Sequence, residues 1–232
     1  MIKGIIFDFN GTLFFDSHIH FEAFDQFLTS LGKTPPPPEL RVATLLGRTN
    51  RQCFRTYYDE NASDDVLDSL ADRKEAIYRS LCLSHPEYMH LVKGAEELLD
   101  YLKAHGIPYA IATGSRKDNM DFYFRHLGLA RWFSYDNIIY DDQSFQGKPA
   151  PDIYLKTADR LGLIPSECLV FEDGDSGVLA AHRAGIAAIG VIHEPSVPAP
   201  NTGDIVIDSI ANDFTHFPSV LSRHGLLKED PC

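Results

Sequence analysis

Short, nearly continuous apolar runs recur along the chain, and polar residues follow each of them. The first run covers residues 2–9 and ends in the polar loop Asp8-Phe9-Asn10-Gly11-Thr12. Further runs lie at residues 109–113, 137–140, 168–173, 187–192 and 204–208. Runs of this length and composition are typical of strands that are buried on both faces of a sheet. We therefore expect a strand at each of these six positions.

Helical patterns separate several of the expected strands. They cover residues 94–105, 151–161 and 175–184, and they are closed by Gly106, Gly162 and Gly185 respectively. Strands that alternate with helices of this length indicate a parallel sheet with right-handed crossovers. The predicted fold class is therefore α/β, with a Rossmann-like parallel sheet as its core and helices on both faces.

One long stretch, residues 16–89, interrupts this alternation. It contains helical patterns at residues 17–30, 39–46, 49–58 and 63–83, and a run of prolines at residues 35–38 separates the first two. We expect an all-helical insert here, with the sheet core formed by residues 1–15 and 90–232. Ligands of open α/β sheets bind at the carboxyl edge of the strands, so the insert is expected to act as a cap over that edge.

The net charge of −12 restricts the possible partners of the chain. It argues against nonspecific binding to nucleic acid or to an anionic membrane. An anionic substrate would need a local group of Lys and Arg side chains, or a metal ion, to offset the overall negative field.

The cysteines and the N-terminal residues bear on the cellular setting. Cys53, Cys82, Cys168 and Cys232 are scattered, which favours a reducing compartment and argues against a zinc site. A carboxylate at Asp8 comes too early for a signal peptide, and no apolar run reaches the roughly 20 residues that a membrane span needs. We expect a cytoplasmic protein.

The residues with the most informative chemistry follow the expected strands. Asp8 ends the first strand, Thr113-Gly114-Ser115 ends the second, and Glu172-Asp173 ends a later one, while Lys148 lies in a loop before a helix. Parallel strands share one direction, so their carboxyl ends meet at one edge of the sheet. These side chains are therefore expected to converge on one site.

Phosphoryl transfer needs an oxygen nucleophile, a cation and positioned hydrogen-bond donors. Asp8 can attack phosphorus and form an aspartyl phosphate. Asp8 and Asp173, together with a backbone carbonyl, offer the oxygen ligands that Mg²⁺ prefers, and Glu172 can hold a metal-bound water. Ser115, nearby backbone N–H groups and Lys148 can bind the phosphate. Three converging carboxylates would repel an anion, so this interpretation requires Mg²⁺.

Four segments of the chain, in order, resemble the motifs of the haloacid dehalogenase-like hydrolase superfamily. They resemble in particular its subgroup with a small helical cap, which includes β-phosphoglucomutase and phosphoglycolate phosphatase. The segments are Asp8-Phe9-Asn10-Gly11-Thr12-Leu13, Ala112-Thr113-Gly114-Ser115, Gly147-Lys148-Pro149-Ala150-Pro151-Asp152, and Phe171-Glu172-Asp173 followed by Gly177, Ala180, Ala181, Ala184 and Gly185.

The resemblance implies a role for each of these segments. Asp8 is the implied nucleophile, and the implied metal ligands are Asp8, the carbonyl of Asn10, and Asp173. Thr113 or Ser115, together with Lys148, would hold the phosphate. The cap would select the substrate, with His20 and Arg48 as its candidate residues. The implied partner is a small phosphorylated metabolite, bound by a monomer or a weak dimer.

Asn10 departs from the family pattern, in which a second Asp at this position moves protons. An amide donates hydrogen bonds but does not titrate, and general acid–base catalysis contributes about 10²–10⁴-fold to rates. We therefore predict a phosphatase of reduced rate. Asn10 disfavours a β-phosphoglucomutase-like phosphomutase, and it makes a catalytically impaired phosphate-binding or regulatory protein an open alternative. A hydrolase of carbon–halogen bonds is disfavoured by the acidic pair Glu172-Asp173.

Overall fold

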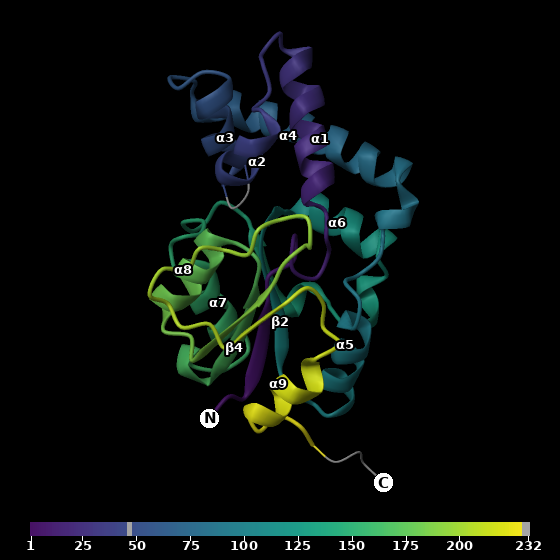
Figure 1. The fold of residues 1–232 in the computed structure, drawn as a ribbon, viewed down its shortest axis with the longest axis vertical. Helices are drawn as coiled ribbons and strands as arrows, with labels where there is room; N and C mark the ends of the chain where they lie inside the picture. Colours follow the sequence, from purple (N-terminus) through teal and green to yellow (C-terminus); the bar gives the residue numbers. More distant parts are fainter. Residues whose placement is uncertain (46–47, 229–232) are drawn as a thin grey trace. The chain divides into compact units, whose positions relative to one another are not determined.

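The computed structural model describes residues 1–45 and 48–228, and these divide into two compact units (Figure 1). One unit comprises Met1–Phe15 and His90–Cys232, and the other comprises Asp16–Met89. The expected helix end at Leu46, the residue Gly47 and the cysteine Cys232 lie outside the described residues.

The first unit is built on a six-stranded parallel sheet with the order β3-β2-β1-β4-β5-β6. The strands are β1 (Gly4–Phe7), β2 (Tyr109–Arg116), β3 (Ile138–Asp141), β4 (Cys168–Glu172), β5 (Ala188–Ile192) and β6 (Ser209–Ala211). All four residues of β1 and all five of β4 are buried, as their apolar sequences predicted. The expected α/β fold is confirmed.

Helices cover both faces of this sheet, with α5 and α6 on one side and α7 and α8 on the other (Figure 1). The helices are α5 (Ala95–Ala104), α6 (Lys117–His126), α7 (Asp152–Arg160), α8 (Asp175–Ala184) and α9 (Phe217–Arg223), with short 3₁₀ turns η2 (Leu129–Arg131), η3 (Tyr135–Asn137) and η4 (Pro165–Glu167). The apolar residues of α7 and α8 pack with those of β1, β4 and β5 into one core cluster.

The pairing of β1 with β4 places Asp8 beside the end of β4. Phe7 is in register with Phe171, and the backbone N–H of Asp8 donates to the carbonyl of Phe171 at 2.9 Å. The aromatic rings of Phe7 and Phe171 stack at 5.6 Å, which fixes this register from the apolar side. Asp8 and Glu172 therefore leave the sheet at the same edge.

The prediction of a strand at residues 204–208 is wrong, because β6 begins only at Ser209. Ile205 and Ile207 do alternate as in a strand, and they pack against the core cluster. The backbone, however, pairs with β5 only from Asp208 onward, whose N–H bonds to the carbonyl of Ile189. The alternation of apolar and polar residues therefore indicated which side chains pack against the core, and an irregular segment can show the same alternation.

The second unit contains helices and, among its described residues, no strand. Its elements are α1 (Ser17–Ser30), α2 (Pro38–Leu45), α3 (Asn50–Tyr57), α4 (Asp64–Ser84) and the 3₁₀ turn η1 (Pro86–Tyr88). A capping box between Thr49 and Gln52 starts α3, and Asp64 and Asp65 lie in the first turn of α4. Phe24, Phe27 and Phe54 are central to its own core cluster.

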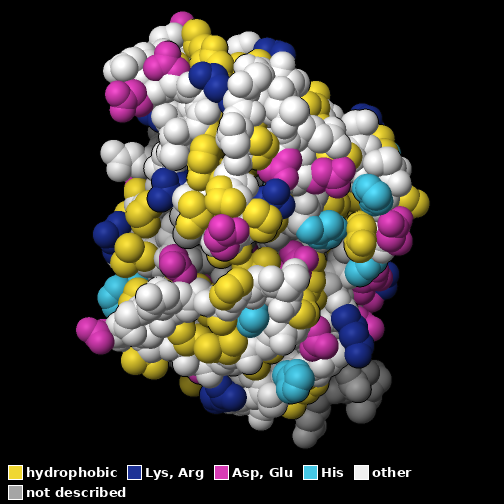
Figure 2. Space-filling view, turned by 45° about the horizontal axis from the view of Figure 1, so that its top comes forward, with side chains coloured by type: hydrophobic (Ala, Val, Ile, Leu, Met, Phe, Trp, Pro, Cys, Tyr) yellow, Lys and Arg dark blue, Asp and Glu magenta, His cyan; other side chains and the backbone are white. Residues whose placement is uncertain are grey.

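The surface of the described residues carries mixed charge. On the face drawn in Figure 2, Lys and Arg side chains are interspersed with Asp and Glu side chains. Within residues 1–45 and 48–228, no helix combines the length and the apolar character that a membrane crossing requires.

Candidate active site

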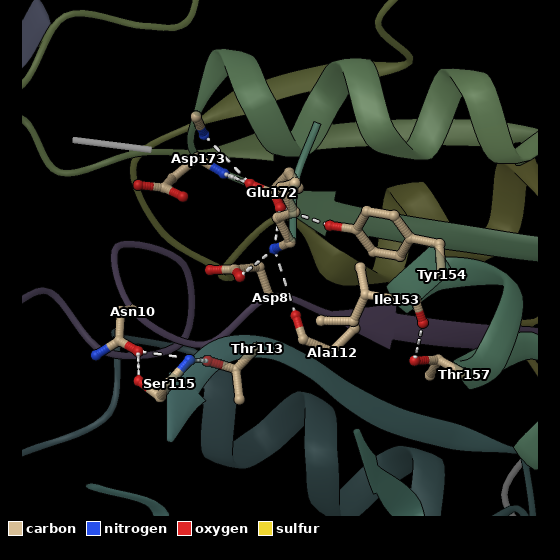
Figure 3. Close-up of polar contacts among 12 residues, drawn as sticks. Asp8, Asn10, Ala112, Thr113, Ser115, Ile153, Tyr154, Thr157, Glu172 and Asp173 are labelled. Carbon is tan, nitrogen blue, oxygen red and sulfur yellow. Dashed lines mark hydrogen bonds and ion pairs between the residues drawn. The ribbon is translucent and has the colours of Figure 1, made fainter. Parts of the chain in front are cut away.

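Three carboxylates meet at the carboxyl edge of the sheet. Asp8 follows β1, Glu172 ends β4, and Asp173 comes directly after it (Figure 3). One oxygen of each lies within 4.8 Å of those of the other two. Asp8 and Glu172 are buried, and Asp173 is partly exposed. The sequence predicted this convergence from the strand ends alone.

Lys148 places its ammonium between two of these carboxylates. Its Nζ lies 2.5 Å from Oδ1 of Asp8 and 2.5 Å from Oε1 of Glu172, and it donates to the carbonyl of Ala112 at 3.4 Å. Its side chain is only 13% exposed. The loop between β3 and α7 thus brings one positive charge to the centre of an acidic site.

Glu172 is held at both of its oxygens. Oε1 accepts from Lys148 and, at 2.5 Å, from the hydroxyl of Tyr154. Oε2 accepts from the backbone N–H groups of Asp173 and Gly174 at 2.9 and 3.3 Å. Since these donors already engage both oxygens, Glu172 is suited to holding its neighbours in place more than to binding a metal directly.

Gly177 makes room for the Glu172 carboxylate. A Cβ atom at Gly177 would lie 1.8 Å from Oε1 of Glu172, well inside any possible contact distance. The buried carboxylate therefore leaves room only for a glycine at this position in the first turn of α8.

The charges at the site shift the pKa values of its members. Burial by itself would lower the pKa of Lys148, but the Asp8 and Glu172 carboxylates outweigh it and the net shift is upward. Burial would raise the pKa of Glu172, but Lys148 and the hydrogen bonds outweigh it and the net shift is downward. Burial and the nearby Glu172 both raise the pKa of Tyr154. The site therefore holds a protonated lysine, an ionised Glu172 and a neutral tyrosine.

Asn10 belongs to a second hydrogen-bonded group beside the carboxylates (Figure 3). Its Oδ1 accepts from the hydroxyl of Ser115 at 2.7 Å and from that of Thr113 at 3.5 Å. Its Nδ2 donates to the hydroxyl of Tyr123 at 2.8 Å. The N-cap of α6 is Arg116, one residue after Ser115. Gly114 is exposed between Thr113 and Ser115.

The donor set fits a small, hard divalent cation. Carboxylate oxygens of Asp8 and Asp173 are the ligands that Mg²⁺ prefers. Gly11, with a φ of +82°, lets the loop after β1 approach Asp173 closely: a Cβ atom there would lie 2.0 Å from Oδ2 of Asp173. The loop that carries Asn10 and the residue Asp173 are therefore in direct contact, as a shared metal site requires.

His20 and Arg48, the candidate substrate-selecting residues, lie in the helical unit. His20 Nδ1 is 2.7 Å from Nζ of the buried Lys74, and its ring stacks on Tyr78 at 4.0 Å. Arg48 is exposed in the segment before α3. Arg51, in the first turn of α3, donates hydrogen bonds to the carboxylate of Asp68 in α4.

Sequence reasoning missed two residues that contact the predicted site, Tyr154 and Tyr123. Both are buried in helices, at positions where an aromatic side chain is expected to pack against the sheet. Their hydroxyl partners, Glu172 and Asn10, lie 18 and 113 residues away in the chain. A buried tyrosine needs a partner for its hydroxyl, and that requirement was the available signal.

Comparisons with known proteins identify relatives over most of the chain. The model of the haloacid dehalogenase-like hydrolase family matches residues 2–185. The chain is 32% identical over 193 residues to the phosphorylated carbohydrates phosphatase of Thermotoga maritima, a match that covers 83% of this chain and 86% of that protein. It is 33% identical over 190 residues to the fructose-1-phosphate phosphatase YqaB of Escherichia coli, covering 81% and 95% of the two chains.

A solved structure has the same fold over almost the whole chain. The HAD hydrolase of family IA, variant 3, from Entamoeba histolytica superposes with a TM-score of 0.79 at 32% identity, covering 93% of this chain and 95% of that one. The expected resemblance is confirmed, and so is the expectation of a hydrolase. On its sequence, its fold and these matches, the chain belongs to the haloacid dehalogenase-like hydrolase family.

Proposed function

We propose that this protein is a Mg²⁺-dependent phosphatase of a small phosphorylated metabolite, with Asp8 as its nucleophile. The observation that carries the proposal is the position of Lys148, whose ammonium bridges Asp8 and Glu172 next to Asp173. A carboxylate nucleophile, a fixed cation and a second metal-binding carboxylate are the groups that phosphoryl transfer needs.

In the proposed reaction a carboxylate oxygen of Asp8 forms a bond to phosphorus, and the bond from phosphorus to the ester oxygen breaks. Lys148 and the hydroxyl of Ser115 donate hydrogen bonds to the phosphate oxygens. Mg²⁺, held by Asp8, Asp173 and the carbonyl of Asn10, would supply positive charge that offsets the charge developing on the phosphoryl group. Water then hydrolyses the aspartyl phosphate and regenerates Asp8.

Asn10 determines how protons move in this scheme. Its amide is oriented by Ser115 and Tyr123 and cannot take up or release a proton. The departing alkoxide therefore takes its proton from water, and the attacking water has no side-chain base at this position. We expect hydrolysis of the aspartyl phosphate to be the slower half-reaction.

The relatives suggest the class of substrate. Two of them are named for phosphorylated carbohydrates and for fructose 1-phosphate, so we propose a sugar phosphate for this chain. We also propose that residues 16–89 act as the cap that selects it, with His20 and Arg48 as contributing residues.

The direct test is a panel of sugar phosphates and other phosphorylated metabolites, assayed for phosphate release with Mg²⁺ and with EDTA. Turnover that needs Mg²⁺ and falls by at least about 10³-fold in Asp8→Asn supports the proposal, since loss of a nucleophile removes a whole reaction path. Asp159→Asn, which changes an exposed carboxylate in α7, is the matched control and should retain full activity. Turnover that survives in Asp8→Asn would show that another group is the nucleophile.

A second candidate function is a phosphate-binding or regulatory protein without turnover of its own, and Asn10 is the observation that favours it. Activity that appears only in Asn10→Asp would select this alternative. Measurable turnover by the unmodified protein would reject it.

A further inference from the structure

Tyr154 contacts the proposed active site from α7, and its hydroxyl has a defined partner there. The side chain is fully buried, and the hydroxyl donates to Oε1 of Glu172 at 2.5 Å (Figure 3). Tyr154 lies in the first turn of α7, between the buried Ile153 and further buried residues of the same helix. Packing against the sheet therefore fixes the ring, and only its hydroxyl reaches the polar site.

The hydroxyl of Tyr154 and the ammonium of Lys148 share one acceptor atom. Both donate to Oε1 of Glu172, and Lys148 donates in addition to Oδ1 of Asp8. The ammonium also lies over the Tyr154 ring, 5.2 Å from its centroid. Glu172 and Asp8 thus compete for the ammonium of Lys148. The hydroxyl of Tyr154 donates its hydrogen bond to Glu172.

A hydrogen bond donated to a carboxylate oxygen lowers its attraction for a second donor. With Tyr154 bound, Glu172 holds Lys148 less tightly, and the ammonium remains available to Asp8 and to a phosphate bound there. Without the hydroxyl, Glu172 would attract the ammonium more strongly.

We propose that Tyr154 is a positioning residue that sets how Lys148 is divided between Glu172 and the phosphate-binding side of the site. The inference rests on the proposed function, because it assumes that Lys148 binds phosphate. It assigns to Tyr154 an effect on phosphate affinity that is separate from metal affinity, since the Tyr154 hydroxyl donates its hydrogen bond to Glu172.

The variant Tyr154→Phe tests this, because it keeps the buried ring and removes the hydrogen bond alone. Tyr109→Phe is the matched control: its hydroxyl donates to the backbone carbonyl of Trp132 at 2.8 Å, away from the carboxylates. Calorimetry would measure the binding of Mg²⁺ alone, and then of inorganic phosphate at saturating Mg²⁺. KM and kcat would be measured with p-nitrophenyl phosphate.

We expect Tyr154→Phe to weaken phosphate binding about 5–10-fold, the equivalent of one net hydrogen bond, and to raise KM similarly. The affinity for Mg²⁺ should stay within about twofold, and Tyr109→Phe should change neither. The effect should also vanish in a Glu172→Gln background, because Tyr154 acts through the charge on Glu172.

Two results would overturn the inference while leaving the proposed function intact. One is unchanged phosphate affinity in Tyr154→Phe. The other is an equal loss of Mg²⁺ and phosphate affinity, which indicates a merely structural contribution. If the unmodified protein neither binds phosphate nor releases it from any ester, the proposed function fails, and the inference fails with it.

Discussion

The hydroxyl of Ser115 donates a 2.7 Å hydrogen bond to Oδ1 of Asn10, although the two residues lie 105 positions apart in the chain. Together with the hydroxyl of Tyr123 at Nδ2, this contact fixes the orientation of the amide. Both hydroxyls are able to donate to an oxygen, so an aspartate would find a hydrogen-bond donor at each of its side-chain oxygens. The surroundings of Asn10 are compatible with a carboxylate at this position.

Asn10→Asp should therefore increase turnover. A carboxylate can protonate the leaving group and deprotonate the attacking water, and we expect kcat for a phosphate ester to rise about 10²–10⁴-fold. Steady-state phosphate release measures this directly. The exposed Asn212→Asp adds the same negative charge elsewhere in the sheet unit and should leave kcat unchanged. A variant that folds normally but turns over no faster would contradict the assigned role of position 10.

Gly177→Ala should destabilise the protein, although the same change in a helix usually stabilises it by about 0.4–1 kcal/mol. The added methyl group would meet the Glu172 carboxylate, with a Cβ–Oε1 distance of 1.8 Å. We expect a loss of about 1–3 kcal/mol in the free energy of unfolding, as for other overpacked sites. Urea denaturation measures it. At Gly174 a Cβ atom meets nothing within 4 Å, so Gly174→Ala should lower the free energy of unfolding clearly less than Gly177→Ala does.

The lowered pKa of Glu172 predicts a loss of stability in acid. The ordinary value of 4.5 applies to the unfolded chain and the folded value lies below it, so the stabilisation is complete above about pH 4.5. It is lost as the pH falls through the folded pKa. Urea unfolding in EDTA between pH 3 and 6 should show this decline, and Glu172→Gln should make it less steep. An unchanged slope would mean that Glu172 has the same pKa in both states.

The three described cysteines should react slowly in the folded protein. Burial raises the pKa of Cys53 and Cys168 to about 11 and that of Cys82 to about 12. The thiolate is the reactive form, so iodoacetamide at pH 8 should label these residues only after unfolding in urea. Peptide mass spectrometry would identify the sites. Rapid labelling of Cys82 in the native state would contradict its burial in α4.

The sequence allowed the sheet and its polar edge to be predicted, because both depend on short-range patterns. The apolar runs before Asp8 and Asp173 can each be recognised from a few consecutive residues. The parallel strands that they form then bring the two carboxylates together. The segment at residues 204–208 misled the same method, since Ile205 and Ile207 alternate without forming a strand.

What the sequence left open are contacts that depend on three-dimensional packing. Tyr154 occupies an apolar helical position, and nothing nearby in the chain indicates that its hydroxyl meets Glu172. The division of Lys148 between Asp8 and Glu172 is also invisible in the sequence, because it depends on distances of a few ångström to residues that lie 140 and 24 positions away in the chain.

The close approach between Gly11 and Asp173 has a consequence for protein engineering. The carboxylate of Asp173 packs directly against the Cα of Gly11. Any side chain at position 11 would therefore displace Asp173 at the end of the neighbouring strand β4. Random mutagenesis of the first loop, or exchange of that loop between homologues, should therefore return active clones only with glycine at this position. The loop after β1 and the end of β4 should therefore be exchanged together.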